Sequence, residues 1–453
     1  MKQKFIIDVN PSTGEIIEKI KCSSPSEVSS AVKNSRKAYK FWRDVPLKTR
    51  LSYFKKIIRA IRNEKNFIAE SITCETGKPI KYSQKEVTDA VKQMENILSF
   101  SEEALCEEIF KSDGDVSKVV HTPFGVIAII CSWNNPFYVA CEYLTTTIIA
   151  GNTAILKPSE IAPGTGTIVY NLFNNFLPKG VINILQGADE VCECLLNTDI
   201  NFISYIGSKA KGKSVISSSV SHVHGYTLQL ISKHAMILTE DASLDKASDF
   251  AIKSLFYKSG HNANSIGRIY VNDKIYDDFI SQILQKIRKV RFGNPFEDVD
   301  VGAIATENLL KKVCSQIEDV RHRGAKILFG GSRIENGGFY LMPTVIADIS
   351  DKNDLMCEET FGPVLAIQRY DDIENVIEKI NKSQIGIEAT VWSRKIKNAE
   401  EIAKKLEVGM VGINKSVKGA KGSPSVCIKQ SGCGYMGCVD SLKLFTYPKK
   451  YTY

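Results

Sequence analysis

Residues 125–130, Gly-Val-Ile-Ala-Ile-Ile, form a short apolar run of the kind that builds a fully buried strand. Three similar runs follow, each separated from the next by a helix-like stretch, at residues 153–156, 181–185 and 201–206. Strand–helix–strand units of this length predict a parallel sheet with helices on both faces. Ligands of such sheets bind at the carboxyl ends of the strands, so the residues that directly follow each run are the first candidates for a site.

The part of the chain before this sheet predicts a hairpin and then helices. Residues 5–9 and 15–20 alternate as two strands around the turn Asn10-Pro11-Ser12-Thr13-Gly14. Ser24 and Glu27 have the spacing of a capping box, which predicts that a helix begins there. Two further helices are expected, near 51–61 and over about 83–107.

A second series of helices and strands begins at about residue 245 and predicts a second α/β lobe. Its helices are expected at 245–258, 276–290 and 308–323. Its strands are expected at 268–271, 325–329, 363–368, 388–392 and 409–413. The tail, residues 445–453, is rich in Tyr and Lys and predicts an extended edge strand.

The composition is that of an ordinary globular protein. The 453 residues are 43% hydrophobic and 24% charged, and this length predicts two or three domains. The net charge is +8, but Lys and Arg are scattered among Asp and Glu, which favours a mixed surface over a nucleic-acid or membrane face. No apolar run approaches the roughly 18 residues of a membrane span, and residues 1–9 are too mixed for a signal peptide. We therefore expect a soluble, cytoplasmic protein.

The twelve cysteines are spread thinly and form no Cys-x-x-Cys pair. Cys192 and Cys194 stand closest together, and no histidine lies near them in the sequence. This pattern predicts no metal site and favours reduced thiols in a reducing compartment.

Polar motifs follow the predicted strands, and together they form a specific set. Trp133-Asn134 follows the first strand, and Lys157-Pro158-Ser159-Glu160 follows the second. Gly207-Ser208 and Gly212 open a helix after the fourth strand, and Glu359-Thr360-Phe361 precedes a later one. Each motif is weak evidence alone, but their order, spacing and placement after strands are distinctive.

This set resembles the aldehyde dehydrogenase superfamily, and the resemblance covers nearly the whole chain. It begins at residues 10–15, includes Glu75-Thr76-Gly77-Lys78-Pro79, and ends at residues 429–434 and 445–446. The resemblance implies the α/β aldehyde dehydrogenase fold. That fold has a Rossmann-like nucleotide-binding domain, an α/β catalytic domain and a small β oligomerisation arm. By this resemblance, residues 1–103 and 124–231 form the nucleotide-binding domain, 232–424 the catalytic-type domain, and 104–123 with 425–453 the arm.

The resemblance also implies roles for the motif residues. Asn134 matches the asparagine whose amide donates a hydrogen bond to the oxyanion of a tetrahedral intermediate. Lys157 and Glu160 match the pair that holds the adenosine ribose, and a carboxylate there weakly favours NAD over NADP. The alternatives are structural: an amide that caps a turn and a solvated loop pair.

Two further features of the resemblance concern the rest of a nucleotide. Gly207, Ser208 and Gly212 match a phosphate turn that opens a helix, and the basic Lys209 and Lys211 would suit a phosphate. Glu359 and Phe361 match the residues that hold the nicotinamide ribose and ring, and Trp133 is a further candidate for binding the cofactor. We therefore expect NAD or NADP as a cofactor, with an ordinary helix start, a turn carboxylate and a core Phe as the alternatives.

The chain departs from the family pattern where the chemistry is expected. Gly260 and Arg268 fix the register of the nucleophile loop, and the position of the family's cysteine falls on Ala263, which has no nucleophilic atom. The stretch that carries the general base has Gln229, which cannot accept a proton at neutral pH. Ile231 replaces a glycine beside the expected nicotinamide and could crowd the ring. Pro424-Ser425-Val426-Cys427 replaces a stretch that helps to close the substrate tunnel.

These departures predict a protein impaired in NAD(P)-dependent aldehyde oxidation, which acts as a nucleotide-binding regulatory or structural subunit. The alternative is an active oxidoreductase with a non-cysteine mechanism, in which Asn134 and His261 orient a hydrated aldehyde. His261 is otherwise expected to be a surface or loop histidine. The expected partners are the nucleotide, an aldehyde, and either a second copy of the chain or an active relative, in a dimer or tetramer built through the arm.

Overall fold

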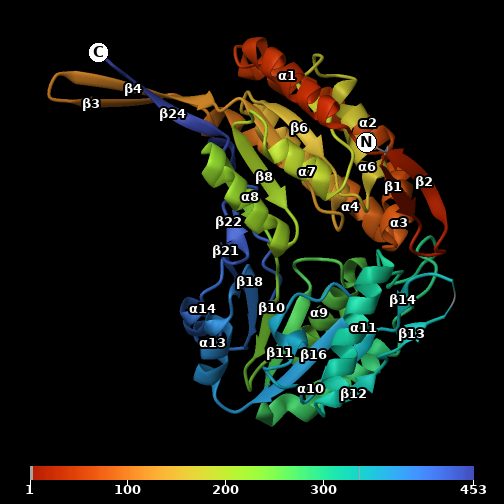
Figure 1. The fold of residues 1–453 in the computed structure, drawn as a ribbon. Helices are drawn as coiled ribbons and strands as arrows, with labels where there is room; N and C mark the ends of the chain where they lie inside the picture. Colours follow the sequence, from red (N-terminus) through yellow and green to blue (C-terminus); the bar gives the residue numbers. More distant parts are fainter. Residues whose placement is uncertain (1–3, 336) are drawn as a thin grey trace.

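The computed structural model describes residues 4–335 and 337–453 and shows two α/β lobes with an arm that projects from one side (Figure 1). The chain begins in the antiparallel hairpin β1 (Phe5–Val9) and β2 (Ile16–Lys21). Helix α1 (Pro25–Trp42) follows, and the Ser24 hydroxyl and Glu27 carboxylate cap it reciprocally. The predicted hairpin and capping box are therefore confirmed.

Three helices come next, one more than the sequence predicts. They are α2 (Leu47–Asn63), α3 (Lys65–Thr76) and α4 (Ile80–Ala104), so the predicted long helix ends earlier than residue 107. Helix α3 follows α2 with only Glu64 between them, and neither Pro nor Gly marks the boundary. Gly77 ends α3 at φ 70°, where its lack of a Cβ avoids strain.

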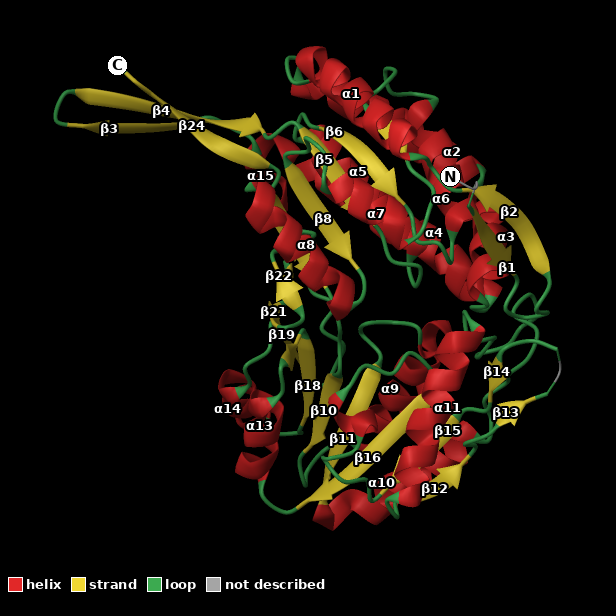
Figure 2. Ribbon diagram, viewed as in Figure 1, coloured by secondary structure: helices red, strands yellow, loops and turns green. Residues whose placement is uncertain are grey.

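The first lobe is built on a six-stranded sheet of order β22-β9-β8-β5-β6-β7, parallel except for β22. Its strands are β5 (Val126–Ile130), β6 (Thr153–Lys157), β7 (Ile182–Ile184), β8 (Phe202–Ile206), β9 (Gly225–Gln229) and β22 (Gly432–Cys433). The helices between them are α5 (Pro136–Ile149), α6 (Pro163–Asn174), α7 (Asp189–Leu196) and α8 (Lys209–His222). Strands β5, β6 and β8 are buried along their whole length, because helices cover both faces of the sheet (Figure 2).

The second lobe is a seven-stranded sheet of order β12-β15-β16-β11-β10-β18-β19, with β12 antiparallel. Its strands are β10 (His234–Leu238), β11 (Ile266–Asn272), β12 (Lys326–Phe329), β15 (Thr344–Ala347), β16 (Val364–Tyr370), β18 (Glu388–Trp392) and β19 (Met410–Ile413). Its helices are α9 (Leu244–Phe256), α10 (Tyr276–Ile287), α11 (Glu307–His322), α12 (Asp354–Cys357), α13 (Ile373–Lys382) and α14 (Ile396–Lys405), with short 3-10 turns η1 (Tyr257–Gly260) and η2 (Asp273–Ile275). The predicted second α/β lobe is thus confirmed.

The arm is a three-stranded antiparallel sheet that projects from the first lobe (Figures 1 and 2). Its strands are β3 (Glu108–Ser112), β4 (Asp115–Pro123) and β24 (Thr446–Thr452), and β24 confirms the extended tail. The remaining short elements are β13 (Arg333–Ile334), β14 (Tyr340–Leu341), β17 (Ile385–Gly386), β20 (Ser425–Val426), β21 (Ile428–Lys429), β23 (Tyr435–Met436) and α15 (Val439–Lys443). Of the C-terminal strands among the described residues, only β24 lies in the arm, whereas β22 joins the first sheet, so the arm is smaller than the expected residues 425–453.

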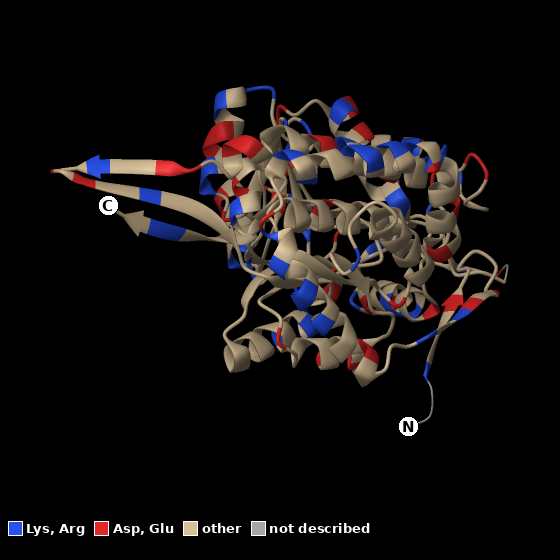
Figure 3. Cartoon of the chain, turned by 90° about the horizontal axis from the view of Figure 1, so that it is seen from above, with Lys and Arg blue, Asp and Glu red and all other residues tan. Residues whose placement is uncertain are grey.

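Basic and acidic residues are interspersed over the lobes, as Figure 3 shows from above. None of the helices among the described residues is both long enough and apolar enough to cross a membrane.

Candidate functional site

A cavity of about 1140 Å³ lies between the two lobes. The carboxyl ends of β5, β6, β8 and β9 border it from the first lobe, and the amino ends of β10 and β18 border it from the second. Ten residues that the sequence predicts for the site line it: Trp133, Asn134, Lys157, Glu160, Gly207, Ser208, Gln229, Ala263, Glu359 and Phe361. Gly212 lies outside this lining, in α8, where a Cβ would come within 2.6 Å of the Leu230 side chain.

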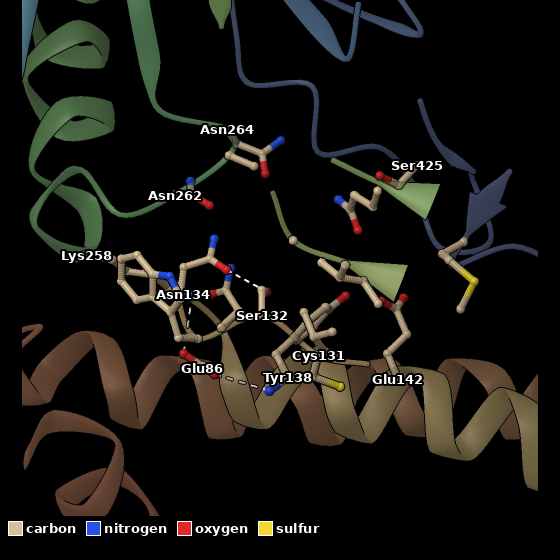
Figure 4. A pocket seen from close by; sticks show the side chains of 18 of the residues that line it. Glu86, Cys131, Ser132, Asn134, Tyr138, Glu142, Lys258, Asn262, Asn264 and Ser425 are labelled. Carbon is tan, nitrogen blue, oxygen red and sulfur yellow. Dashed lines mark hydrogen bonds and ion pairs between the residues drawn. The ribbon is translucent and has the colours of Figure 1, made fainter. Parts of the chain in front are cut away.

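Asn134 presents a hydrogen-bond donor to the cavity. It lies in the loop that joins β5 to α5, and its side chain is mostly buried. Its Oδ1 accepts a hydrogen bond from the Ser132 hydroxyl at 2.8 Å, so the amide nitrogen Nδ2 is directed away from Ser132 (Figure 4). A fixed N–H donor at a cavity wall can stabilise negative charge on a carbonyl oxygen.

A buried charge cluster lies directly beneath Asn134. The Lys78 ammonium pairs with Oε2 of Glu86 on α4 and donates to the backbone oxygen of Asn134 at 3.0 Å. The Lys258 ammonium lies 3.5 Å from the same Glu86 oxygen. Glu86 also accepts hydrogen bonds from the backbone N–H groups of Phe137 and Tyr138 at the start of α5. Burial by itself would raise the pKa of Glu86, but the two lysines outweigh it, and the pKa is lowered.

The adenosine end of the expected site carries an ionised carboxylate between lysines. Lys157 Nζ lies 3.5 Å from Glu160, and Lys211 Nζ, on the first turn of α8, lies 3.2 Å from it. Burial favours a raised pKa for Glu160, but Lys157 and Lys211 lower it, so the carboxylate is charged and can accept hydrogen bonds from hydroxyl groups. Ser208 caps α8, whose N-terminus favours an anion.

The nicotinamide end of the expected site carries Glu359, Phe361 and Trp133. Glu359 accepts a hydrogen bond from the Ser232 backbone N–H at 2.8 Å, and burial raises its pKa to about 7. The Phe361 and Trp133 rings contact each other edge to face at 5.7 Å. Leu230 lines the cavity, whereas Ile231 is absent from its lining among the described residues, so the structure gives no support for the expected crowding of the ring by Ile231. The chain leaves the sheet just after Gln229, so Leu230 and Ile231 belong to the loop that joins β9 to β10.

The loop that carries Ala263 is held in an unusual backbone conformation. Lys258 and Ser259 have φ values of 57° and 56°, and Gly260 has 78°. A Cβ on Gly260 would meet the Gly362 backbone oxygen at 2.3 Å, so this position requires glycine. Ala263 and its neighbour Asn262 then line the cavity.

His261 lies in a loop, which is one of the two expectations for it, but it is buried and not at the surface. It is only 1% exposed and lies edge to face on Trp133, with ring centroids 5.0 Å apart. Neither ring nitrogen has a hydrogen-bond partner among the described residues, and burial lowers its pKa to about 3. Because it does not line the cavity either, the structure gives no support for an aldehyde oriented by His261.

Two thiols line the cavity among the described residues, and both are protonated. Burial raises the pKa of Cys131 to about 12 and also raises the pKa of Cys192. Because the thiolate is the nucleophile, neither residue substitutes for a cysteine at position 263. The described residues contain no group of His, Cys, Asp or Glu that could hold a metal ion.

Several cavity residues were not foreseen from the sequence. Glu142 on α5 accepts a hydrogen bond from Gln93 at 2.9 Å, and burial raises its pKa to about 7. His234 Nδ1 lies 3.0 Å from Glu388, which also accepts a hydrogen bond from the Asn264 amide at 2.6 Å. These contacts join residues far apart in the sequence. Only Glu388 could have been identified from the sequence, as a carboxylate at the start of a buried strand.

The segment around Pro424 does border the cavity, as the sequence predicts. Pro424 and Ser425 line it together with the preceding loop, residues 416–423. Strand β20 then pairs with β23, which fixes this segment against the first lobe.

Comparison with known proteins identifies the class to which this fold and cavity belong. The family model for the aldehyde dehydrogenase family matches residues 1–451, and the chain belongs to that family. It is 30% identical to human 2-aminomuconic semialdehyde dehydrogenase over 99% of this chain and 95% of the relative.

Solved structures agree with this membership. An NADP-dependent enzyme of E. coli superposes with a TM-score of 0.96 at 25% identity, covering 99% of this chain and 95% of the other. A 3,6-anhydro-L-galactose dehydrogenase in complex with NAP superposes at 0.95 and 26% identity, covering 100% and 96%. The predicted aldehyde dehydrogenase fold is therefore confirmed, and NAD or NADP is the cofactor class that belongs with it.

Proposed function

We propose that this chain is a nucleotide-binding member of the aldehyde dehydrogenase family that does not oxidise aldehydes by the thiol-dependent route, and that it serves as a regulatory or structural subunit. The observation that carries the proposal is the pair Ala263 and Gln229, which line the same cavity as Asn134, the residue that we expect to act as the oxyanion donor. A methyl group cannot attack a carbonyl, and an amide cannot take a proton from water at neutral pH.

The residues of the cavity suit a nicotinamide dinucleotide. Lys157 and Glu160 would hold the adenosine ribose, Ser208 and the α8 N-terminus the phosphates, and Glu359 the nicotinamide ribose. The partly buried, ionised Glu160 beside a helix N-terminus supports this assignment, because such a carboxylate can accept hydrogen bonds from hydroxyl groups and such a terminus favours an anion. When bound, the nucleotide supplies a hydride acceptor. The protein's own part is to bind and orient it.

We expect purified protein to bind NAD or NADP in isothermal titration and to form NADH or NADPH from a panel of aldehydes at least roughly 10³-fold more slowly than ordinary dehydrogenases. The binding should weaken on Lys157→Ala, whereas Lys382→Ala, on an exposed helix face, serves as the matched control. Turnover at ordinary dehydrogenase rates would overturn the proposal. If the protein neither binds NAD or NADP nor oxidises aldehydes, the result would favour a structural role that does not involve a nucleotide.

The arm supports an assembly of two or four chains. Its strands expose large apolar side chains, with Ile109 62%, Phe110 54% and Tyr447 41% accessible. Exposed apolar residues on a projecting edge favour pairing with another chain. We therefore expect a dimer or tetramer by light scattering, and a shift toward the monomer when residues 446–453 are removed. A monomeric wild-type protein at micromolar concentration would contradict this.

A further inference from the structure

The Lys258 amine is a cavity residue to which neither the sequence motifs nor the family membership gives a role. It stands five positions before Ala263, on the strained turn η1, and its side chain is only 5% exposed. Figure 4 shows it beside Asn134 and above Glu86, at the wall of the cavity. A lysine side chain that is buried and still borders a cavity is uncommon, because burial disfavours its charge.

The surroundings of Lys258 contain more positive charge than their carboxylate can balance. Lys78 and Lys258 share one oxygen of Glu86, and Lys78 is the closer of the two. Asp89, one turn further along α4, adds a weaker attraction, and the Tyr257 ring lies 5.1 Å from the amine. Burial and the Lys78 charge outweigh these attractions and lower the pKa of Lys258 to about 8. A useful fraction of the amine is therefore neutral, and nucleophilic, near physiological pH.

We infer that Lys258 captures the carbonyl group of an aldehyde in this cavity as a reversible imine. The inference rests on the proposed function in one respect, namely that the cavity admits an aldehyde. It adds a covalent binding residue where the position of the usual nucleophile is a methyl group.

The chemistry balances without a further reactant. The neutral Nζ attacks the carbonyl carbon and a C–N bond forms; one proton passes from the nitrogen to the carbonyl oxygen, which gives a neutral carbinolamine. The nitrogen then loses its second proton, the hydroxyl oxygen takes up a proton, the C–O bond breaks, and water leaves as the C=N bond of the imine forms. The Asn134 amide nitrogen, which is turned away from Ser132 in the same cavity, would donate a hydrogen bond to the oxygen as negative charge develops on it. Glu86 and the ammonium of Lys78, 3.0 Å from the Asn134 carbonyl oxygen, stay in place beneath the reacting amine.

The test uses the wild-type protein, propanal as the probe and sodium cyanoborohydride as the trapping reagent, at pH 7 to 10. Peptide mapping by mass spectrometry then locates the propyl groups. At pH 7 we expect Lys258 to carry label roughly 10²-fold faster than an ordinary exposed lysine, because a much larger fraction of it is neutral. This advantage should shrink as the pH rises toward 10, since the neutral fraction of Lys258 saturates above about 8 while exposed lysines continue to deprotonate.

Lys233 is the matched control. It is equally buried, and burial lowers its pKa to about 7, but it contacts Thr360 and does not line the cavity among the described residues. Labelling of Lys258 no faster than Lys233 or exposed lysines would overturn the inference. In the variant Lys258→Met, the peptide that contains position 258 should lose its propyl group, and the labelling of all other peptides should stay the same. The variant Asn134→Ala should slow the labelling of Lys258 without changing the labelling of surface lysines.

NADH formation is measured on the same samples, so that the two ideas can fail separately. Rapid NADH formation would contradict the proposed function whatever the label shows. If no NADH forms and Lys258 carries no label, the inference that Lys258 forms an imine is overturned, while the proposed function stands.

Discussion

We expect the double variant Ala263→Cys/Gln229→Glu to form NADH or NADPH from simple aldehydes at least roughly 10²–10³-fold faster than the wild-type protein. Both positions already line the cavity with Asn134. A sulfur on residue 263 supplies the atom that attacks the carbonyl carbon. A carboxylate on residue 229 supplies the base that activates water for release of the acid.

The single variants separate the two steps. Ala263→Cys alone should give a burst of about one NADH per chain and then stall, because the acylated cysteine lacks a base to hydrolyse it. Gln229→Glu alone should remain as inactive as the wild type. The Gln229 backbone oxygen accepts a hydrogen bond from the Gly207 N–H at 3.0 Å, so the strand holds either side chain at the same place.

Ala263→Ser/Gln229→Glu is the control, since it has the same backbone and nearly the same volume but a weaker nucleophile. The double variant Ala263→Cys/Gln229→Glu could fold, bind nucleotide and still show neither a burst nor turnover. In that case the wild-type protein is inactive for a reason other than the lack of a nucleophile and a base at these two positions. Stopped-flow absorbance of NADH, with nucleotide binding measured in parallel, distinguishes these outcomes.

The second large effect expected is on stability. Glu86→Gln should lower the stability of the protein by about 3–5 kcal/mol, because it leaves two buried ammonium groups without their carboxylate. The amide oxygen can still accept from the N–H groups at the start of α5, so the change reports chiefly on charge. For a chain of 453 residues this corresponds to a fall in the unfolding temperature of roughly 3–5 °C.

Glu378→Gln is the matched control, because Glu378 forms an exposed pair with Lys382 one helical turn away and should give no measurable change. The variant Lys78→Met/Glu86→Gln should recover part of the loss, since it removes the more deeply buried ammonium together with the carboxylate. An unfolding temperature of Glu86→Gln equal to that of the wild type would show that the three groups are not charged in the folded protein.

Much of the fold could be predicted because it depends on short-range patterns. The capping box at Ser24 and the apolar runs of β5, β6 and β8 are local features, and each forms where the sequence places it. Helix α3 was missed because it follows α2 without a Pro or Gly to mark the boundary. The site motifs could be placed because parallel strands bring their carboxyl ends to one edge.

The sequence by itself determined the family, the strand ends that border the cavity, and the presence of Ala and Gln at positions 263 and 229. Only the tertiary structure decided that His261 is buried against Trp133, and that Lys258 shares Glu86 with Lys78 beneath Asn134. The physical reason is that charge and nucleophilicity depend on burial and on neighbours from distant segments, and no local pattern records either.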